Sequence, residues 1–325
     1  GENSNFWYRD AVKVFEENGI GWAWWPFKRI GAIQPPMSIS YNEKYNKIVD
    51  YWNGGGEAPS KEDAIEGLRQ LTEDIKFENT RYQKDVIDAL FRQPFSDETI
   101  PYAENIIPGK VFASDFDLGI MGEAYYDAGS EANYGGDFSA WNNGWAYRND
   151  NVDIQNNEDP LSNGYNVGWI ESDEWMQYTL KDPTSGLYNI KVRVATEDND
   201  GSFYFKINDN QVTDLINVPN TESWTNWSFV NIDSLVVYDT DDKFVFQVKT
   251  GTFNLGFFEF ERIGDINLLQ TKYISSFTLS ENSININFNK NLDNTSILNK
   301  SDFLLNINDQ EKDIQNVNYS SSPRS

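Results

Sequence analysis

The sequence has no cysteine and no histidine among its 325 residues. The absence of cysteine excludes disulfides, zinc–thiolate sites and thiol nucleophiles, and the absence of histidine excludes imidazole bases and the commonest transition-metal ligand. Acid–base chemistry in this chain would therefore depend on carboxylates or tyrosine. No run of 18 apolar residues is present either, so we expect no membrane-spanning helix.

Basic residues are scarce, because 26 lysines and arginines stand against 51 acidic residues and give a net charge of -25. This charge repels duplex nucleic acid and anionic membrane surfaces, so neither is an expected partner and a neutral partner fits better. Aromatic residues make up 15% of the chain and include 11 tryptophans. We expect some of these rings to lie at the surface, where a flat apolar face stacks on a ligand.

The first 28 residues predict one helix and one strand. Ser4 or Asn5 caps the helix, and Asn18 with Gly19 provides a left-handed stop. The run IGWAWWPFK over residues 20–28 then predicts a short buried strand, closed by Pro26. One helix and one strand cannot form a sheet alone, so they must belong to a larger fold or dock on another element.

The stretches GENSNFWY and NGIGWAWWPFK resemble the last βα turn and final strand of family 5 glycoside hydrolases, retaining β-glycanases built on a (β/α)8 barrel. The resemblance implies that the nucleophilic Glu precedes Gly1 and that the acid/base Glu lies much earlier. No catalytic residue is therefore assigned, and Glu2, beside the nucleophile position, is the one candidate. Trp25 matches the ring that floors a sugar subsite, although it could instead fill the barrel wall.

Residues 1–100 are expected to be the C-terminal remnant of such a barrel with a helical extension. Ser60 and Asp63 form a capping box before an amphipathic helix, and a second helix is predicted from about Thr80 to Phe91. The Pro-flanked polar stretch 94–105 is predicted to be a linker.

Residues 107–263 predict an antiparallel β-sandwich of about seven short strands separated by Asn, Asp and Gly turns. In LYNIKVRV, residues 187–194, apolar and polar side chains alternate with the period of a strand that buries one face. The same alternation predicts that six side chains lie in the core: Phe203, Phe205, Ile207, Phe244, Phe246 and Val248.

This region resembles family 6 carbohydrate-binding modules through five motifs in the family's order: IPGKVFASDFD, WAYRNDNVDI, YNVGWIESDEWMQYTL, PNTESWTNW and GTFNLGFFEFERI. The resemblance implies a β-jelly roll with a sugar-binding cleft in its loops. It also implies a ligand platform of Tyr147, Trp224 and Asn254.

The chemistry of these three residue types agrees with a sugar site. A pyranose ring has an apolar CH face and a belt of hydroxyls, so it suits flat aromatic rings beside a planar amide that donates and accepts. Asn254 could instead bridge strands only. Three further tryptophans lie in strand runs and are predicted to belong to the core: Trp169, Trp175 and Trp227.

No cofactor is expected, and a structural calcium ion stays open. Many modules of the resembled family hold calcium near the first strand, where this sequence has Phe112 and Ser114, with Glu261 near the end of the domain. The insertion at residues 125–145 is longer than usual for the family. It could extend the cleft or pack against the barrel remnant.

The expected fold class is therefore mainly β: a jelly-roll sandwich, preceded by part of a (β/α)8 barrel and followed, over residues 264–325, by a truncated Ig-like β segment or a tail. The expected function is binding of a neutral β-glycan as the targeting module of a secreted, monomeric, endo-acting glycoside hydrolase. The alternatives are a structural or adhesion β-sandwich without a sugar site, and residual endo-β-glucanase activity that uses Glu2. The sequence leaves the identity of the glycan open.

Overall fold

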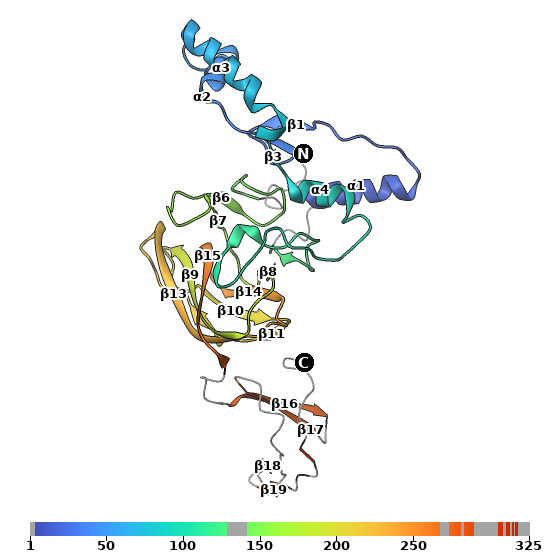
Figure 1. Ribbon diagram of the computed structural model, residues 1–325, viewed down its shortest axis with the longest axis vertical. Coiled ribbons are helices and arrows are strands. Elements are labelled where there is room, and N and C mark those ends of the chain that lie inside the picture. Colours follow the sequence, from blue (N-terminus) through green and yellow to red (C-terminus); the bar gives the residue numbers. More distant parts are fainter. Residues whose placement is uncertain are drawn as a thin grey trace.

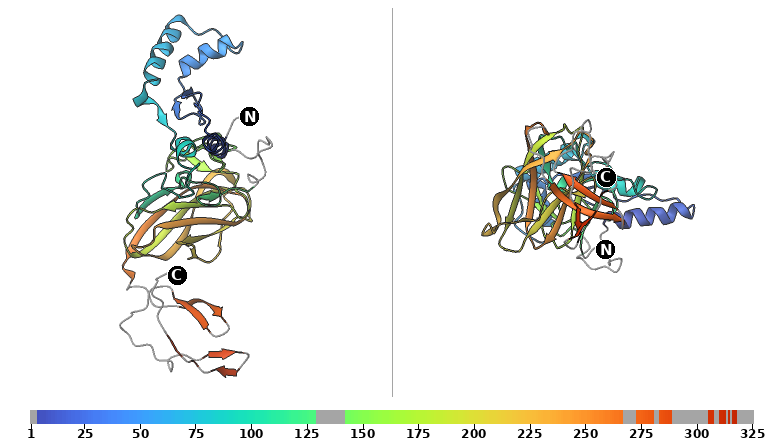
Figure 2. Two further views of the ribbon diagram at one scale, coloured as in Figure 1. Left: turned by 90° about the vertical axis from the view of Figure 1, so that its right-hand side faces the viewer. Right: turned by 90° about the horizontal axis from the view of Figure 1, so that it is seen from below.

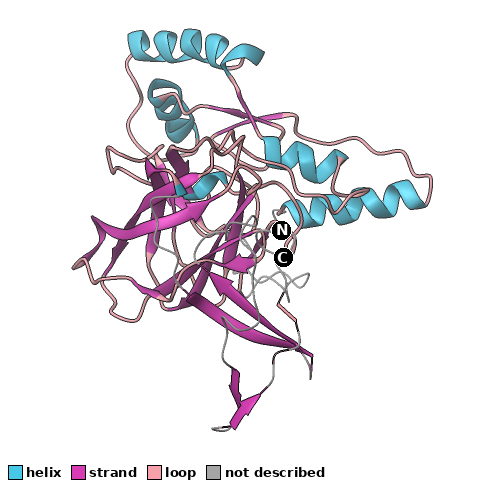
Figure 3. Ribbon diagram, turned by 60° about the horizontal axis from the view of Figure 1, so that its bottom comes forward, coloured by secondary structure: helices cyan, strands magenta, loops and turns pink. Residues whose placement is uncertain are grey.

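The computed structural model describes residues 4–128 and 142–266, and in the C-terminal region residues 273–280, 283–288, 305–307, 310–312, 314, 316 and 317. An N-terminal helical segment, a β-sandwich and two small hairpins follow one another along the chain (Figure 1). The α-helices gather in one part of the molecule, and most of the strands lie in the other (Figure 3). Glu2 and most of the insertion at 125–145 lie outside the described residues.

Helices α1 (Asn5–Glu17) and α4 (Lys84–Phe91) pack against each other in the N-terminal segment. Gly19, with φ of 64°, follows α1 at the predicted left-handed stop. Trp22 and Trp24 pack on the small core between the two helices. The side chains that form this core are Tyr8, Val12, Val86, Ala89 and Leu90.

The buried strand predicted in IGWAWWPFK is wrong, because residues 20–27 form no strand. A buried strand needs hydrogen-bonding neighbours, and the described part of the chain supplies none for this run. Trp25 is consequently 89% exposed. The small sheet that does form joins β1 (Lys28–Ile30), β2 (Met37–Ile39) and β3 (Arg81–Tyr82), and the described residues contain no (β/α)8 barrel.

Helices α2 (Glu43–Trp52) and α3 (Lys61–Asp74), followed by the short η1 (Phe77–Asn79), fill the middle of this segment. The predicted cap of α3 is confirmed, since Ser60 Oγ accepts a hydrogen bond from Asp63 N at 3.0 Å. The apolar face of this amphipathic helix is mainly exposed, and α3 meets α2 at Gly67 instead. None of the described helices has the length and apolar character needed to cross a bilayer.

The second half of the predicted linker is part of the sandwich. Ile100 and Leu118 exchange two backbone hydrogen bonds of 3.0 and 2.8 Å, and Lys181 N donates to Asn105 O at 2.9 Å. Tyr102, between them, is buried. The linker prediction is therefore wrong for residues 100–105, which join the helical segment firmly to the sandwich (Figure 2).

The sandwich consists of two antiparallel sheets, which confirms the predicted architecture of residues 107–263. The first sheet has the order β11-β10-β14-β8-β5, with β12 beside β10; the second has the order β13-β9-β15-β7-β6, with β4 beside β15. The first sheet comprises β5 (Tyr125–Tyr126), β8 (Trp175–Thr179), β10 (Ser202–Ile207), β11 (Asn210–Gln211), β12 (Ile216–Asn217) and β14 (Lys243–Thr250). The second comprises β4 (Gly109–Phe112), followed by η2 (Ala113–Asp115), then β6 (Ile154–Asn156), β7 (Tyr165–Val167), β9 (Gly186–Thr196), β13 (Ser223–Val237) and β15 (Asn254–Gly264).

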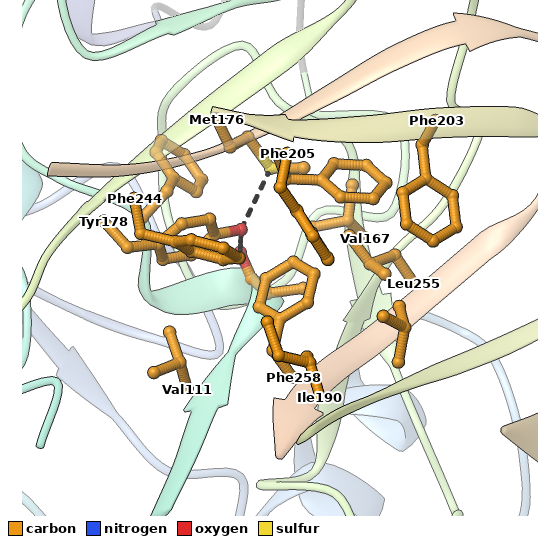
Figure 4. Packing of buried hydrophobic residues seen from close by; sticks show 14 of the residues in the cluster. Val111, Val167, Met176, Tyr178, Ile190, Phe203, Phe205, Phe244, Leu255 and Phe258 are labelled. Carbon is orange, nitrogen blue, oxygen red and sulfur yellow. Dashed lines mark hydrogen bonds between the residues drawn. The ribbon is translucent and has the colours of Figure 1, made fainter. Parts of the chain in front are cut away.

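An aromatic core fills the space between the two sheets (Figure 4). All six side chains predicted from the alternation are fully buried there, which confirms that prediction. Phe258 of β15 lies among Phe244, Tyr178 and Phe205, with ring centroids 5.3, 5.4 and 5.7 Å from its own. Burial of this apolar area fixes which face of each strand points inward, and so fixes what the strand ends present to solvent.

The C-terminal region shows two separate hairpins. One joins β16 (Tyr273–Ser280) to β17 (Ser283–Phe288), and the other joins β18 (Leu305–Ile307) to β19 (Gln310–Lys312). Two separate two-stranded sheets do not establish the expected Ig-like domain.

Candidate functional site

Two side-chain amides meet beside a glycine at one end of the second sheet. Gly168 directly follows β7, and Asn254 begins the neighbouring β15, where Leu255 pairs with Val167. A Cβ atom on Gly168 would lie 2.9 Å from Asn254 Oδ1 and 3.2 Å from Gln155 Nε2. The missing side chain therefore leaves room for both amides to lie over the backbone of Gly168.

The amide of Asn254 has a fixed orientation. Its Nδ2 donates a hydrogen bond to the backbone oxygen of Trp224 at 2.7 Å, and the side chain is only 5% exposed. Its Oδ1 then faces Gly168. The predicted pair Trp224 and Asn254 is thus brought together by the structure.

Two tryptophans with exposed indoles lie at the backbone positions that this amide contacts, one at Trp224 itself and one directly after Gly168. Trp224 is 36% exposed at the start of β13, and Trp169, directly after Gly168, is 50% exposed. The prediction that Trp169 belongs to the core is wrong, because β7 ends at Val167 and Trp169 has a left-handed φ of 47° that takes it out of the strand alternation. In the sequence, the one sign that Trp169 lies outside the core is the glycine before it at the end of a strand. The sequence gives no sign that Gln155 lies beside Asn254.

Trp175 and Trp227 also lie outside the core, contrary to prediction. In β8, Met176 and Tyr178 point inward, so Trp175 takes the outer face. It stands between two register partners, Tyr126 of β5 and Gln247 of β14. Trp227 lies on the outer face of the other sheet, where its ring would be 3.4 Å from a Cβ on Gly256.

Tyr147, the predicted partner of Trp224 in the platform, belongs to a different aromatic group. Its ring lies 4.4 Å from that of Tyr165, and the Arg81 guanidinium lies over it at 4.5 Å from the ring centroid. Arg81 also donates a hydrogen bond to the backbone oxygen of Tyr147, and the Tyr147 hydroxyl donates to Asp115 Oδ1 at 2.5 Å. Burial, with the Asp115 charge, raises the pKa of this hydroxyl strongly. A sugar could stack on this face only if Arg81 left it.

A buried polar network joins the helical segment to the loop after Tyr147. Asn5 Nδ2, at the start of α1, donates to Asp85 Oδ2 and Asp150 Oδ1, both at 2.8 Å, and Asn149 N donates to the same Asp85 oxygen at 2.6 Å. Arg148, fully buried, pairs with Asp150 at 2.6 Å. Burial and the charge of Asp150 raise the pKa of Asp85 to about 6. Helices α1 and α4 are therefore docked on the sandwich, held by groups that have little access to water.

Carboxyl groups gather next to the loop that carries Trp169. Asp153 O accepts from Gly168 N at 2.9 Å, and burial raises the pKa of the Asp153 side chain to about 6. Burial, together with the charge of Asp127, raises the pKa of Glu174 to about 9. In the described ranges, no group of three or more acidic residues is arranged to hold a metal ion.

One family model matches most of the sandwich region. Residues 146–262 match the model of the carbohydrate binding module (family 6). The search of curated proteins gave no match. The match to the family model covers Trp169, Trp224 and Asn254, and it supports a family 6 module in this part of the chain.

Several solved structures are similar over part of the chain. One is the C-terminal module of LamC, a marine laminarinase from Zobellia galactanivorans, with 27% identity, 34% of this chain and 88% of that chain covered, and a TM-score of 0.31. Another is a module of Cellvibrio mixtus lichenase 5A in complex with cellotriose, with 24% identity, 34% and 87% covered, and a TM-score of 0.32. A third is a β-1,3-glucan binding module from Bacillus halodurans, with 16% identity, 49% and 99% covered, and a TM-score of 0.35.

We predict that Glu174→Gln flattens the pH dependence of stability. The pKa of Glu174 in the folded chain lies above its ordinary value of 4.5. The contribution of Glu174 to the free energy of unfolding is therefore fully present below about pH 4.5, and it is lost as the pH rises towards about 9. The wild-type chain should lose on the order of a few kcal/mol across this window. The amide variant cannot ionise, so it should be the more stable protein at about pH 8.5.

Urea unfolding at about pH 5 and 8.5 measures this difference directly. Asp182→Asn, an exposed acidic residue with φ of 45° in a turn, is the matched control that removes one carboxylate without burial. If the free energy of unfolding changed equally with pH in wild type and Glu174→Gln, the assignment of the buried charge to Glu174 would be contradicted.

Proposed function

We propose that residues 107–263 bind a neutral β-glycan polysaccharide at Trp169, Trp224 and Asn254. One observation carries this proposal: two exposed indoles lie at the backbone positions that a single amide contacts, and that amide is locked by a hydrogen bond to the backbone of Trp224. A preorganised site of this kind loses little side-chain entropy when a ligand arrives.

The chemistry of the group suits a sugar ring. Indole faces stack on the apolar CH face of a pyranose, while a planar amide donates to one hydroxyl and accepts from another. Gly168 lets the amide of Asn254 lie over the backbone, and Gln155 provides a second amide beside the first. This set contains no ionisable group, which fits an uncharged ligand.

The charge of the chain supports the same class of ligand. A net charge of -25 disfavours nucleic acid, acidic polysaccharides and anionic lipid surfaces, but does not repel a neutral glycan. Glucans with 1,3, 1,4 or mixed linkages and xylan are the candidates to be tested.

The wider context is part of the proposal. We place the module in a secreted, monomeric β-glycanase, on the resemblance of GENSNFWY and NGIGWAWWPFK to family 5 glycoside hydrolases. In that context Trp25 would contribute to a sugar subsite, and its 89% exposure leaves its ring available. Glu2 as a catalytic residue, and adhesion without a sugar site, are the alternatives.

Trp169→Ala and Trp224→Ala are each expected to weaken glycan binding by about tenfold or more, equivalent to about 1.4 kcal/mol. Each variant removes one stacking face while the core is untouched, so the fold should be retained. Affinity electrophoresis of the full chain in gels containing soluble β-glucans or xylan measures the loss as reduced retardation.

Trp52→Ala is the matched control, since Trp52 is an equally large exposed indole at the end of α2. It should run like wild type. Absence of retardation of the folded wild-type chain in every glycan would favour the adhesion alternative. Retardation that survives in the Trp169 and Trp224 variants together would move the site elsewhere, for example to the outer face around Trp175. Release of reducing sugar from the same glycans would favour residual hydrolase activity.

Arg81→Ala separates the roles of Trp169 and Tyr147. If Trp169 is the second ring of the platform, removal of the guanidinium from Tyr147 should leave glycan affinity unchanged, although it should cost some stability through lost cation–π and hydrogen-bond contacts. If the sequence-based assignment of Tyr147 holds, uncovering its face should raise the affinity. Calorimetric titration, at a temperature where circular dichroism shows the variant folded, distinguishes the two results.

A further inference from the structure

The loop before β6 is fixed to that strand by one buried side chain. Asn142 Oδ1 accepts from Ile154 N at 2.7 Å and from Gly144 N at 3.1 Å. Its Nδ2 donates to the backbone oxygens of Ala146 and Arg148 at 2.8 and 2.9 Å. The Asn142 amide thus uses both its oxygen and its nitrogen in hydrogen bonds to backbone groups of the loop and of β6. These bonds fix the path of the loop.

Two further contacts hold the loop against the edge of β6. Asn143 donates from its backbone N and its Nδ2 to the two carboxylate oxygens of Asp153, at 2.6 and 2.8 Å. A Cβ on Gly144 would lie 2.7 Å from the Cα of Gln155, so the backbone runs in direct contact with the strand. The loop thus continues the second sheet beyond its edge strand.

Trp145 stands at the tip of this fixed loop. Its φ is 50°, in the left-handed region that residues other than glycine rarely adopt. Trp145 is 46% exposed. Holding a large residue there costs of order 1–3 kcal/mol, and the Asn142 and Asn143 contacts offset that cost. The loop therefore presents an indole to solvent in a defined position.

The order of the strands places the loop that carries this indole beside β6, on the side of that strand away from β7. The sequence of neighbours is β15 with Asn254, β7 leading to Gly168 and Trp169, β6 with Gln155, and then the loop with Trp145. Neighbouring strands are about 4.8 Å apart, so three steps separate Asn254 from the loop by roughly 14 Å. That span is longer than one sugar ring and follows the order of the strands across the second sheet.

We propose that Trp145 is a further stacking residue, which extends the site across β6 so that it binds several consecutive sugars of a linear glycan. This inference rests on the proposed function and deepens it. Trp169, Trp224 and Asn254 bind one part of the glycan, Gln155 lies between the two ends, and Trp145 stacks on a sugar farther along. The ligand is then the interior of a long chain, because only such a chain reaches both ends of the site.

Trp145→Ala should leave the affinity for the shortest binding oligosaccharide unchanged and reduce that for the longest by about tenfold, as expected for one lost stacking contact. Isothermal titration of the full chain with a series from di- to hexasaccharide, cut from the glycan that gives the strongest retardation, provides the comparison. Trp145→Phe should restore most of the length dependence, because it keeps an aromatic face. Trp52→Ala should follow the wild-type curve.

Two results would overturn the inference while the proposed function stands. One is a Trp145→Ala affinity equal to wild type at every length. The other is an equal loss at every length, which would show that Trp145 only supports the loop. If the wild-type chain binds no oligosaccharide of any length, the proposed function itself fails, and Trp145 has no glycan to extend along.

Discussion

The packing of Asn254 against Gly168 is the constraint on which the candidate site depends. Because position 168 has no side chain, the amide of Asn254 can lie over the backbone and still reach the oxygen of Trp224. One hydrogen bond of 2.7 Å thus sets the orientation of the amide and its place next to Trp224. Trp169 follows the same glycine, so both rings take their positions from one point where β7 and β15 meet.

The aromatic residues of the module serve two different purposes. Around Tyr147, rings and the Arg81 guanidinium stack on one another and join the helical segment to the sandwich, backed by the buried network of Asn5, Asp85 and Arg148. Around Asn254 the indoles are exposed. Arg81 of β3 covers the first group, while the indoles of the second are open to solvent.

The sequence predicted the sandwich well because each strand buries one face, and the alternation of residues 203–207 and 244–248 records that face directly. The sequence-based prediction placed Trp169 in the core. That was wrong because the alternation stops at Val167, and the backbone then leaves the strand with a left-handed residue at Trp169. The family resemblance placed Tyr147 in the platform. The contact of its ring with Arg81, 66 residues away, leaves no local pattern in the sequence. The run IGWAWWPFK looks like a buried strand, but local sequence cannot show whether neighbouring strands are present to pair with it.

Gly168→Ala tests the central claim most directly, because the added methyl group would lie 2.9 Å from Asn254 Oδ1 and displace the amide without removing any ligand-contacting group. Calorimetric titration of the full chain with its glycan, alongside thermal unfolding, gives affinity and stability together. We expect affinity to fall by about tenfold or more while the folded state persists. A Gly168→Ala chain that is folded and binds as tightly as wild type would contradict the account.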